Sequence, residues 1–239
     1  MSLAVCTIAY NEREWIQRCI RQFNSFVARH MVLVSSRPWF GNGPGKDDGT
    51  ADVARKEGAE VHVQHWRSEA EQRNWGLAQL MGFDYVLIVD ADELYSRTGI
   101  EAMIAALRSL RQPYFRIREM RTYWKTMDYI CAPIEGWEAP VIAVDPKRVT
   151  FYKQRQVKQT TGDPLPAAST LPATLHHMSW VKSDEKIREK IGSFSHAEHI
   201  RPGWYENVWL QWAPEMRDIA PYSFEEMHAV YSPCPALDD

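Results

Sequence analysis

The segment that most constrains the fold is a short apolar stretch that ends in three carboxylates. Residues 85–89 read Tyr-Val-Leu-Ile-Val, a run of aromatic, β-branched and leucine side chains. Such a run is typical of a strand that is buried on both faces of a parallel sheet. Asp90, Asp92 and Glu93 follow it directly. Because open α/β sheets bind ligands beyond the carboxyl ends of their strands, we expect these acids at a binding edge.

The spacing of two of these acids favours a shared ligand. Side chains two residues apart on an extended chain point the same way, and the small Ala91 leaves Asp90 and Asp92 free to converge. Two close carboxylates attract a cation, and hard oxygen ligands suit Mg²⁺ or Mn²⁺. The alternative is that the acids only cap the following helix. A Walker B strand also ends in acid, but the glycine-rich residues 41–47 lack the Walker A spacing.

The size and composition of the chain indicate an ordinary globular protein. Its 239 residues suit one large domain or one domain with a small appendage, and 45% of them are hydrophobic, enough for a substantial core. No apolar run is long enough to span a membrane, and no leader peptide is recognisable. The four cysteines form no C-x-x-C pair, so we expect reduced thiols in a cytoplasmic protein.

Charge is distributed unevenly along the chain. The formal net charge is −3, yet residues 111–158 contain ten Lys or Arg against five Asp or Glu. A basic surplus in one region suggests an anionic partner there, and a solvated surface is the alternative.

The first 90 residues alternate between strand and helix patterns. Asn11 with Glu14, and Ser68 with Glu71, have the spacing of helix capping boxes, and Gly58 follows the second helix, where glycine ends helices. This alternation predicts right-handed βαβ crossovers and a mostly parallel sheet. The predicted strands cover residues 3–9, 31–35, 60–64 and 85–89, and the predicted helices cover residues 15–27, 50–56 and 68–81.

The second half follows a different pattern. A helix is predicted over residues 99–110, and short mixed or antiparallel strands follow it. The proline-containing residues 160–173 are predicted to form a loop, which we interpret as a lid, and Ser183 caps a further helix. From Trp204 onward the chain is aromatic and irregular. The short strands are predicted over residues 114–120, 122–129, 141–144 and 149–152.

Several motifs of residues 3–95 together resemble the family 2 glycosyltransferases of the GT-A fold. They are Ala9-Tyr10-Asn11-Glu12, the Asp48-Gly49-Thr50 segment up to Ala54, Gln72-Arg73-Asn74-Trp75-Gly76, and Asp90-Ala91-Asp92, which has the form of a DXD motif. His176-His177 before residues 183–187 is similar to the segment that returns a histidine to the metal. One departure is at the end of the second strand, where residues 35–39 replace the usual acid.

The resemblance implies an α/β GT-A (Rossmann-like) fold, a mostly parallel sheet flanked by helices with a smaller mixed acceptor-side region. Residues 1–110 would form the nucleotide-sugar-binding half, and residues 111–239 the acceptor-binding half of the same domain with its C-terminal helices. The implied activity is metal-dependent transfer of a hexosyl or pentosyl group, with inversion, from a nucleotide-diphosphate sugar to a hydroxyl acceptor. The acceptor stays open: a glycan is the common case, and the basic surplus of residues 111–158 also fits DNA with a hydroxymethylated base. The alternatives are a sugar nucleotidyltransferase and a non-catalytic carbohydrate-binding relative.

The resemblance and the chemistry of transfer also assign roles to residues. A Mn²⁺ or Mg²⁺ ion at Asp92 would stabilise the charge that grows on the leaving phosphate. Asp90 would contact the donor ribose or a metal-bound water. Arg73 is expected to pair with a donor phosphate, and the alternative is a surface ion pair with Glu69. The donor residues are Ala9, Tyr10, Asn11, Glu12, Arg73, Asp90, Ala91 and Asp92, and the metal ligands are Asp92, Asp90, His177 and His176.

The acceptor side carries weaker sequence signals. Inverting transfer to a hydroxyl needs a base near the acceptor, and Glu135 and Glu138 lie in a loop of the acceptor half, with Asp128 in reserve. Aromatic side chains stack on sugars and bases, although they are more often part of the core. The candidates for acceptor stacking are Trp124, Trp137 and Trp204.

Overall fold

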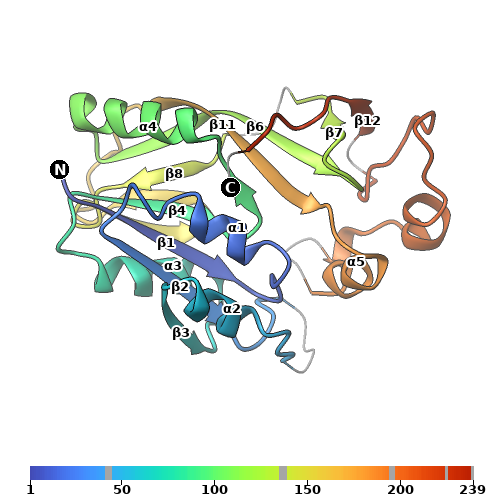
Figure 1. The fold of residues 1–239 in the computed structure, drawn as a ribbon, viewed down its shortest axis with the longest axis horizontal. Coiled ribbons are helices and arrows are strands. Elements are labelled where there is room, and N and C mark those ends of the chain that lie inside the picture. Colours follow the sequence, from blue (N-terminus) through green and yellow to red (C-terminus); the bar gives the residue numbers. More distant parts are fainter. Residues whose placement is uncertain (41–44, 135–138, 194–196, 224–225, 238–239) are drawn as a thin grey trace.

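Four parallel strands form the N-terminal half of the sheet in the computed structural model, which describes residues 1–40, 45–134, 139–193, 197–223 and 226–237 (Figure 1). The acidic strand lies beside the first strand of the chain, and the order β4-β1-β2-β3 is parallel throughout. The elements are β1 (Leu3–Ala9), α1 (Ile16–Arg21), β2 (Arg29–Ser35), α2 (Thr50–Lys56), β3 (Glu60–Gln64), α3 (Glu69–Gln79) and β4 (Tyr85–Asp90).

The second half extends the same sheet with mixed strands. The full order is β12-β7-β6-β8-β4-β1-β2-β3, and β11 pairs in parallel with β6 and antiparallel with β5. The α/β class predicted for a GT-A fold, with its mixed C-terminal region, is therefore confirmed. The elements are β5 (Glu93–Leu94), α4 (Arg97–Leu110), β6 (Tyr114–Trp124), β7 (Tyr129–Ala132), β8 (Val141–Val144), β9 (Val149–Lys153), β10 (Gln156–Gln159), β11 (Ser169–Trp180), α5 (Asp184–Ile191), a 3-10 turn (Ala197–His199), a π-helical turn (Tyr205–Trp209) and β12 (His228–Tyr231).

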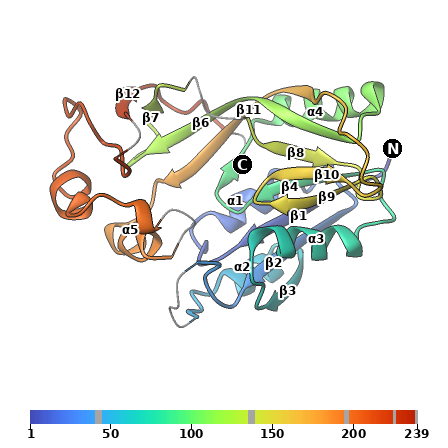
Figure 2. The same ribbon diagram turned by 180° about the vertical axis from the view of Figure 1, so that it is seen from behind.

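The sheet lies between two layers because alternate strand residues face opposite sides. Leu87 of β4 belongs to a core that includes residues of α1 and α4, whereas Val86 and Ile88 belong to a core shared with α3 and the β9–β10 hairpin. Figure 2 shows α3 and the hairpin on the face opposite α4. Covering layers on both faces bury β4 completely up to its acidic end, as its apolar sequence predicted.

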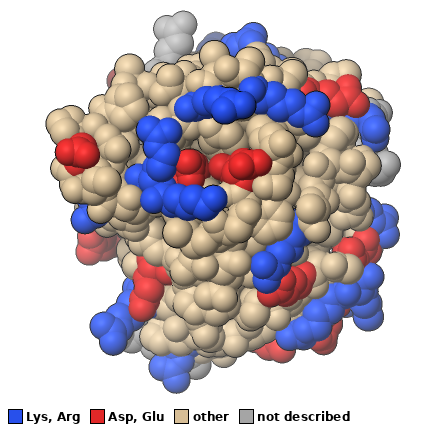
Figure 3. Space-filling view, turned by 90° about the vertical axis from the view of Figure 1, so that its left-hand side faces the viewer, with Lys and Arg blue, Asp and Glu red and all other residues tan. Residues whose placement is uncertain are grey.

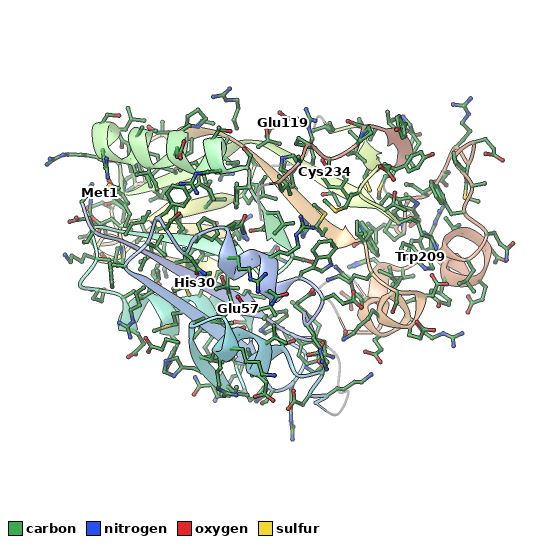
Figure 4. All side chains as sticks on the ribbon, in the orientation of Figure 1. Met1, His30, Glu57, Glu119, Trp209 and Cys234 are labelled. Carbon is green, nitrogen blue, oxygen red and sulfur yellow. The ribbon has the colours of Figure 1, made fainter. Side chains whose placement is uncertain are left out.

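A separate core in the C-terminal region contains four tryptophans. Trp124, Trp180, Trp204 and Trp209 pack edge-to-face or tilted, with ring centroids 5.0–6.4 Å apart. Figure 4 shows Trp209 at the opposite end of the molecule from Met1. Trp124 and Trp204 are only 0% and 2% exposed, so the prediction that they stack on an acceptor is wrong. These rings pack against one another in the core instead.

Several predicted elements have different boundaries in the structure. The first helix covers only Ile16–Arg21, and Asn11 does not cap it because its backbone is left-handed, with φ of 55°. The predicted strands over residues 114–120 and 122–129 are one strand to Trp124 and then a turn. The predicted loop over residues 160–173 ends early, because β11 begins at Ser169 and its Pro172 falls in a β-bulge, where proline is tolerated.

Several predicted helix ends are confirmed. The Ser68 hydroxyl accepts a hydrogen bond from the Glu71 amide at the start of α3, and the Ser183 hydroxyl accepts one from the Lys186 amide at the start of α5. Gly58, with φ of 84°, follows α2. Within the described part of the chain, none of the helices has both the length and the apolar character needed to cross a bilayer.

Helix α3 approaches β1 closely at Gly76. A Cβ atom at this position would lie 2.5 Å from Cys6 Sγ and 3.0 Å from Leu33 Cδ1, both of which are buried. Any larger side chain would therefore push α3 away from the sheet. The glycine of the Gln-Arg-Asn-Trp-Gly motif is thus explained by packing.

Replacing Gly76 with alanine should lower the free energy of unfolding by about 1–3 kcal/mol, the usual cost of overpacking a core. Gly82→Ala is the matched control, because a Cβ at Gly82 meets no atom within 4 Å. Urea denaturation at neutral pH measures both. Equal stabilities of the two variants would contradict the close packing of α3 on β1.

Candidate functional site

A cleft of about 240 Å³ is lined by residues from the carboxyl ends of β1 and β4, from β11 and from α5. It brings together every predicted donor residue except Arg73, and it includes the predicted metal ligand His177. The cleft therefore lies where an open α/β sheet binds its ligand. The other lining residues are Ile8, Trp39, Glu69, Ser179, Lys182, Lys186, Glu189, Lys190 and Ser193.

Asp90 is held by two buried guanidinium groups. Arg73 Nη2 lies 2.8 Å from Asp90 Oδ1, and Arg155 Nη2 lies 3.1 Å from Asp90 Oδ2 and 2.6 Å from Glu93 Oε2. Burial opposes ionisation of Asp90, but Arg155 and Arg73 outweigh it and lower its pKa. Both carboxylate oxygens of Asp90 thus have cationic partners, and a metal ion is not needed to balance its charge.

Arg73 is not a surface residue. Its side chain is 1% exposed and bonds both Glu69, at 2.9 Å, and Asp90. Arg73 therefore pairs with carboxylates of the protein and does not line the cleft, where a donor phosphate was expected. The expected Glu69 pair is present, but it is buried on the Arg73 side rather than exposed.

Asp92 has a different set of partners. Its Oδ1 lies 3.5 Å from His177 Nε2, and its Oδ2 lies 3.2 Å from Lys182 Nζ, which also bonds the Glu12 carboxylate. Burial opposes ionisation of Asp92, but the Lys182 ammonium and His177 hold its pKa well below the usual value. Burial raises the pKa of Glu12, against the effect of Lys182. Asp92 is therefore an ionised carboxylate that reaches the cleft beside an imidazole.

His176 points away from this site, so its prediction as a metal ligand is wrong. Adjacent residues of a strand project to opposite sides, and His177 is the one that faces Asp92. His176 Nδ1 lies 2.9 Å from the Tyr123 hydroxyl and 3.5 Å from Cys234 Sγ. Burial lowers the pKa of His176 to about 4, so it is a neutral residue on the other side of β11.

The remaining residues of the Gln-Arg-Asn-Trp-Gly motif join α3 to its surroundings. Gln72 accepts a hydrogen bond from Trp39 Nε1 at 2.6 Å and donates one to the Leu33 carbonyl at 2.7 Å. Asn74 bonds the backbone of Phe151 in β9 through both its amide atoms, each at 2.8 Å. The motif therefore fixes one aromatic wall of the cleft and the hairpin that carries Arg155.

Asp48 joins three segments at the other side of the cleft. Its carboxylate accepts hydrogen bonds from the Thr50 amide at 3.1 Å, the Arg13 amide at 3.2 Å and Lys186 Nζ at 2.7 Å. The Thr50 hydroxyl in turn accepts from the Glu12 amide at 2.9 Å. These contacts hold the loop after β1 against α2 and α5.

Three lysines that the motifs did not identify line the cleft at intervals of four residues. Lys182 precedes α5, and Lys186 and Lys190 follow on one face of it. The hydrogen bonds of Lys190 Nζ go to the neutral Ser179 carbonyl and hydroxyl, at 2.9 and 2.6 Å. Burial and repulsion by Lys182 lower the pKa of Lys190 to about 8. The four-residue spacing of these lysines, with Lys182 just before the predicted cap Ser183 and the other two after it, was the sequence signal that could have found them.

The other predicted site residues lie elsewhere. Glu135, Glu138 and Trp137 fall outside the described residues, so their roles stay predictions. Asp128 is exposed in the turn between β6 and β7, where it accepts a hydrogen bond from the Thr126 hydroxyl, and it does not line the cleft. Its prediction as the reserve base finds no support in this position.

The side-chain atoms beyond the end of β4 suit a divalent ion that is bound by both the protein and a substrate. In the described residues no cluster of three or more His, Cys, Asp or Glu side chains is arranged to hold a metal. Asp92 and His177 face each other with a carboxylate oxygen and an imidazole nitrogen, which are ligands that Mn²⁺ and Mg²⁺ accept. Such ions often take one or two protein ligands and complete their shell with water and phosphate oxygens.

The basic surplus of residues 111–158 does not gather at this cleft. Arg111 and Arg148, with Arg108, line a hollow around Asp84 and Asp145 at the amino ends of β1 and β4. Figure 3 looks onto this end and shows basic side chains around acidic ones. Arg155, from the same stretch, pairs instead with Asp90 and Glu93 beside the cleft. The basic surplus is therefore divided among different parts of the surface and the interior, and the anionic partner stays a prediction.

Comparison with known proteins gives a partial likeness. No protein-family model matches the sequence, and no curated protein is recognisably similar to it. Part of the fold is similar to glucosyl-3-phosphoglycerate synthase from Mycobacterium tuberculosis. Its complex with Mn²⁺, uridine diphosphate and phosphoglyceric acid is 19% identical, and the match covers 52% of this chain and 43% of that chain with a TM-score of 0.38. Its complex with uridine diphosphate is 18% identical, and the match covers 52% and 45% with a TM-score of 0.39. The chain thus spans less than half the length of these structures.

Replacing Arg155 with methionine should lower the free energy of unfolding by about 3–5 kcal/mol, because removing one partner leaves buried charge at Asp90 and Glu93 uncompensated. Lys153→Met is the control, since Lys153 is exposed on the same hairpin. Chemical denaturation at pH 7 compares the two. A loss no larger than that of the control would contradict the role of Arg155 as the counter-ion of these acids.

Proposed function

We propose that the protein is a metal-dependent glycosyltransferase that moves a sugar from a nucleotide-diphosphate donor to a hydroxyl acceptor. The observation that carries this proposal is the pairing of Asp92 with His177 at the carboxyl edge of the sheet, opposite a row of lysines. The motifs that resemble family 2 glycosyltransferases support the proposal, because they occur in the same order along this chain as in that family. A diphosphate would pair directly with the lysines, and the divalent ion would link it to the acidic wall.

The basic wall suits a leaving nucleoside diphosphate. Charge grows on the diphosphate as the glycosidic bond breaks, and fixed cations in a partly buried cleft stabilise such charge. Lys190 forms its hydrogen bonds with neutral oxygens of Ser179, so a phosphate would give it an anionic partner. Lys186 already pairs with Asp48 and would extend the same wall.

Asp92 and His177 would hold the divalent ion. A bound Mn²⁺ or Mg²⁺ supplies Lewis acid stabilisation of the developing phosphate charge. Asp90 contributes by orientation: Arg73 and Arg155 fix it, and Asp90 in turn fixes the start of the segment that carries Asp92. We assign the remaining contacts with the nucleotide-sugar donor to Tyr10, Asn11 and Glu12, in the loop after β1.

The nucleobase would lie against Trp39 and Tyr10. Their rings are 6.3 Å apart in a T-shaped arrangement, and both line the cleft. Gln72 holds the indole of Trp39 in place through a hydrogen bond. Stacking on this indole would take over part of the role of the acid that is missing after β2, and it would accept different bases.

The acceptor side of the proposal rests on the sequence. Glu135 and Glu138 remain the candidates for the base that deprotonates the acceptor hydroxyl. The candidate acceptors are a glycan and a hydroxymethylated DNA base, and the candidate groups for transfer are a hexose and a pentose. Inversion follows from the family resemblance.

Titration of UDP, GDP, CDP and TDP into the protein, with and without Mn²⁺, tests the proposal. We expect one or more diphosphates to bind more tightly with Mn²⁺, and Asp92→Asn to abolish that increase because a neutral amide is a poor ligand for the ion. Asp128→Asn, which changes an exposed acid outside the cleft, should keep the increase. Metal-dependent binding that survives in Asp92→Asn would refute the assignment of Asp92, and release of pyrophosphate from a nucleoside triphosphate would favour a nucleotidyltransferase.

Trp39→Ala should weaken diphosphate binding by about 1–3 kcal/mol, the range found for loss of base stacking. Trp39→Phe should keep most of the affinity, because it retains an aromatic face while losing only the bond to Gln72. Calorimetric Kd values for the two variants provide the measurement. Similar Kd values for both would rule out stacking on this residue.

A further inference from the structure

Lys182 places a cation on Asp92 without any metal. Its ammonium group lies 3.2 Å from Asp92 Oδ2 and bonds the Glu12 carboxylate, and its side chain is 4% exposed. Asp92 Oδ1 faces His177 on the other side. The two oxygens of Asp92 thus serve two different partners, a permanent ammonium and the imidazole of the candidate metal site.

The position of Lys182 sets it apart from the other lysines of the cleft. Lys186 pairs with Asp48 at 2.7 Å, and Lys190 bonds Ser179, so neither is bonded to Asp92. Burial opposes the charge on Lys182, but Glu12 and Asp92 outweigh it and raise its pKa. Lys182 therefore stays charged, and its charge lies next to the oxygen atoms that a divalent ion would use.

A divalent ion and an ammonium group on one buried carboxylate repel each other, because electrostatic interactions are strong where water is excluded. In the absence of a donor, Lys182 would therefore weaken metal binding. A diphosphate in the cleft offers Lys182 a new anionic partner and weakens its hold on Asp92. Binding of the diphosphate and of the metal would then strengthen each other.

We propose that Lys182 competes with the divalent ion for Asp92, and that the donor diphosphate relieves this competition, so that metal and donor bind as a coupled pair. The second part of this proposal rests on the proposed function, whereas the first part concerns the nucleotide-free protein alone. Lys182 acts here as a positioning residue through Asp92. Its role differs from that of a lysine that merely contacts phosphate.

Binding of Mn²⁺ to the nucleotide-free protein tests the competition, with calorimetry or the electron paramagnetic resonance signal of free Mn²⁺ as the readout. Lys182→Met keeps the length of the side chain and removes its charge, and it should bind Mn²⁺ about ten-fold more tightly than the wild-type protein, within the usual range of coupling between sites. Lys182→Arg keeps the charge and should stay as weak as the wild type.

Lys186→Met is the matched control for a general change of charge in the cleft. It removes the same charge from the same wall but leaves the Asp92 partners in place, so its Mn²⁺ affinity should change by no more than about two-fold. If Lys182→Met is not folded by circular dichroism, Lys182→Gln replaces it, because its amide can still bond Glu12. An uncharged variant that binds Mn²⁺ no more tightly than the wild type or Lys186→Met overturns the proposal.

The coupling is measured by repeating the Mn²⁺ titration in the presence of saturating UDP, or of the diphosphate that binds best. The diphosphate should raise the Mn²⁺ affinity of both proteins. The factor of that increase should be at least about five times larger in the wild type than in Lys182→Met. An unchanged gain would refute the coupling. If no diphosphate binds, the proposed function fails, but the nucleotide-free titration still decides whether Lys182 competes with the metal.

Discussion

The structure depends on the pairing of buried acids with buried cations at the end of β4. Asp90, Asp92 and Glu93 leave the apolar strand within four residues, and each would be costly to bury alone. Arg73, Arg155 and Lys182 supply the opposite charge. These pairs allow an apolar core and a polar cleft to meet at one strand end.

The three cations come from segments that are far apart in the sequence. Arg73 belongs to α3, Arg155 lies in the β9–β10 hairpin, and Lys182 follows β11. The cleft therefore takes side chains from both residues 1–110 and residues 111–239. A division into a donor half and an acceptor half describes the order of the motifs along the chain, whereas the charges of the cleft combine the two halves.

Local patterns explain which features could be predicted from the sequence. The strand that ends at Asp90 and the cap at Ser68 depend on neighbouring residues, so their patterns were readable. Arg155 gave no such signal, because its partners lie more than 60 positions away and only the folded sheet brings them together. Trp124 was misassigned because an aromatic residue has the same sequence appearance in a core as at a binding surface. His176 was misassigned because the strand through it was not predicted, and its direction follows only from that strand.

The two adjacent histidines of β11 have a consequence for the tolerance of the site to errors in strand pairing. A slip of one residue turns every side chain of a strand to the opposite face. At several positions of β11, such as 174, 176 and 179, a slip by one residue would replace a polar side chain by an apolar one. A slip toward the carboxyl end would put His176 where His177 lies now, so an imidazole would still face Asp92, whereas a slip in the other direction would put Met178 there. The repeated histidine thus makes this one contact insensitive to a one-residue shift of β11 toward its carboxyl end.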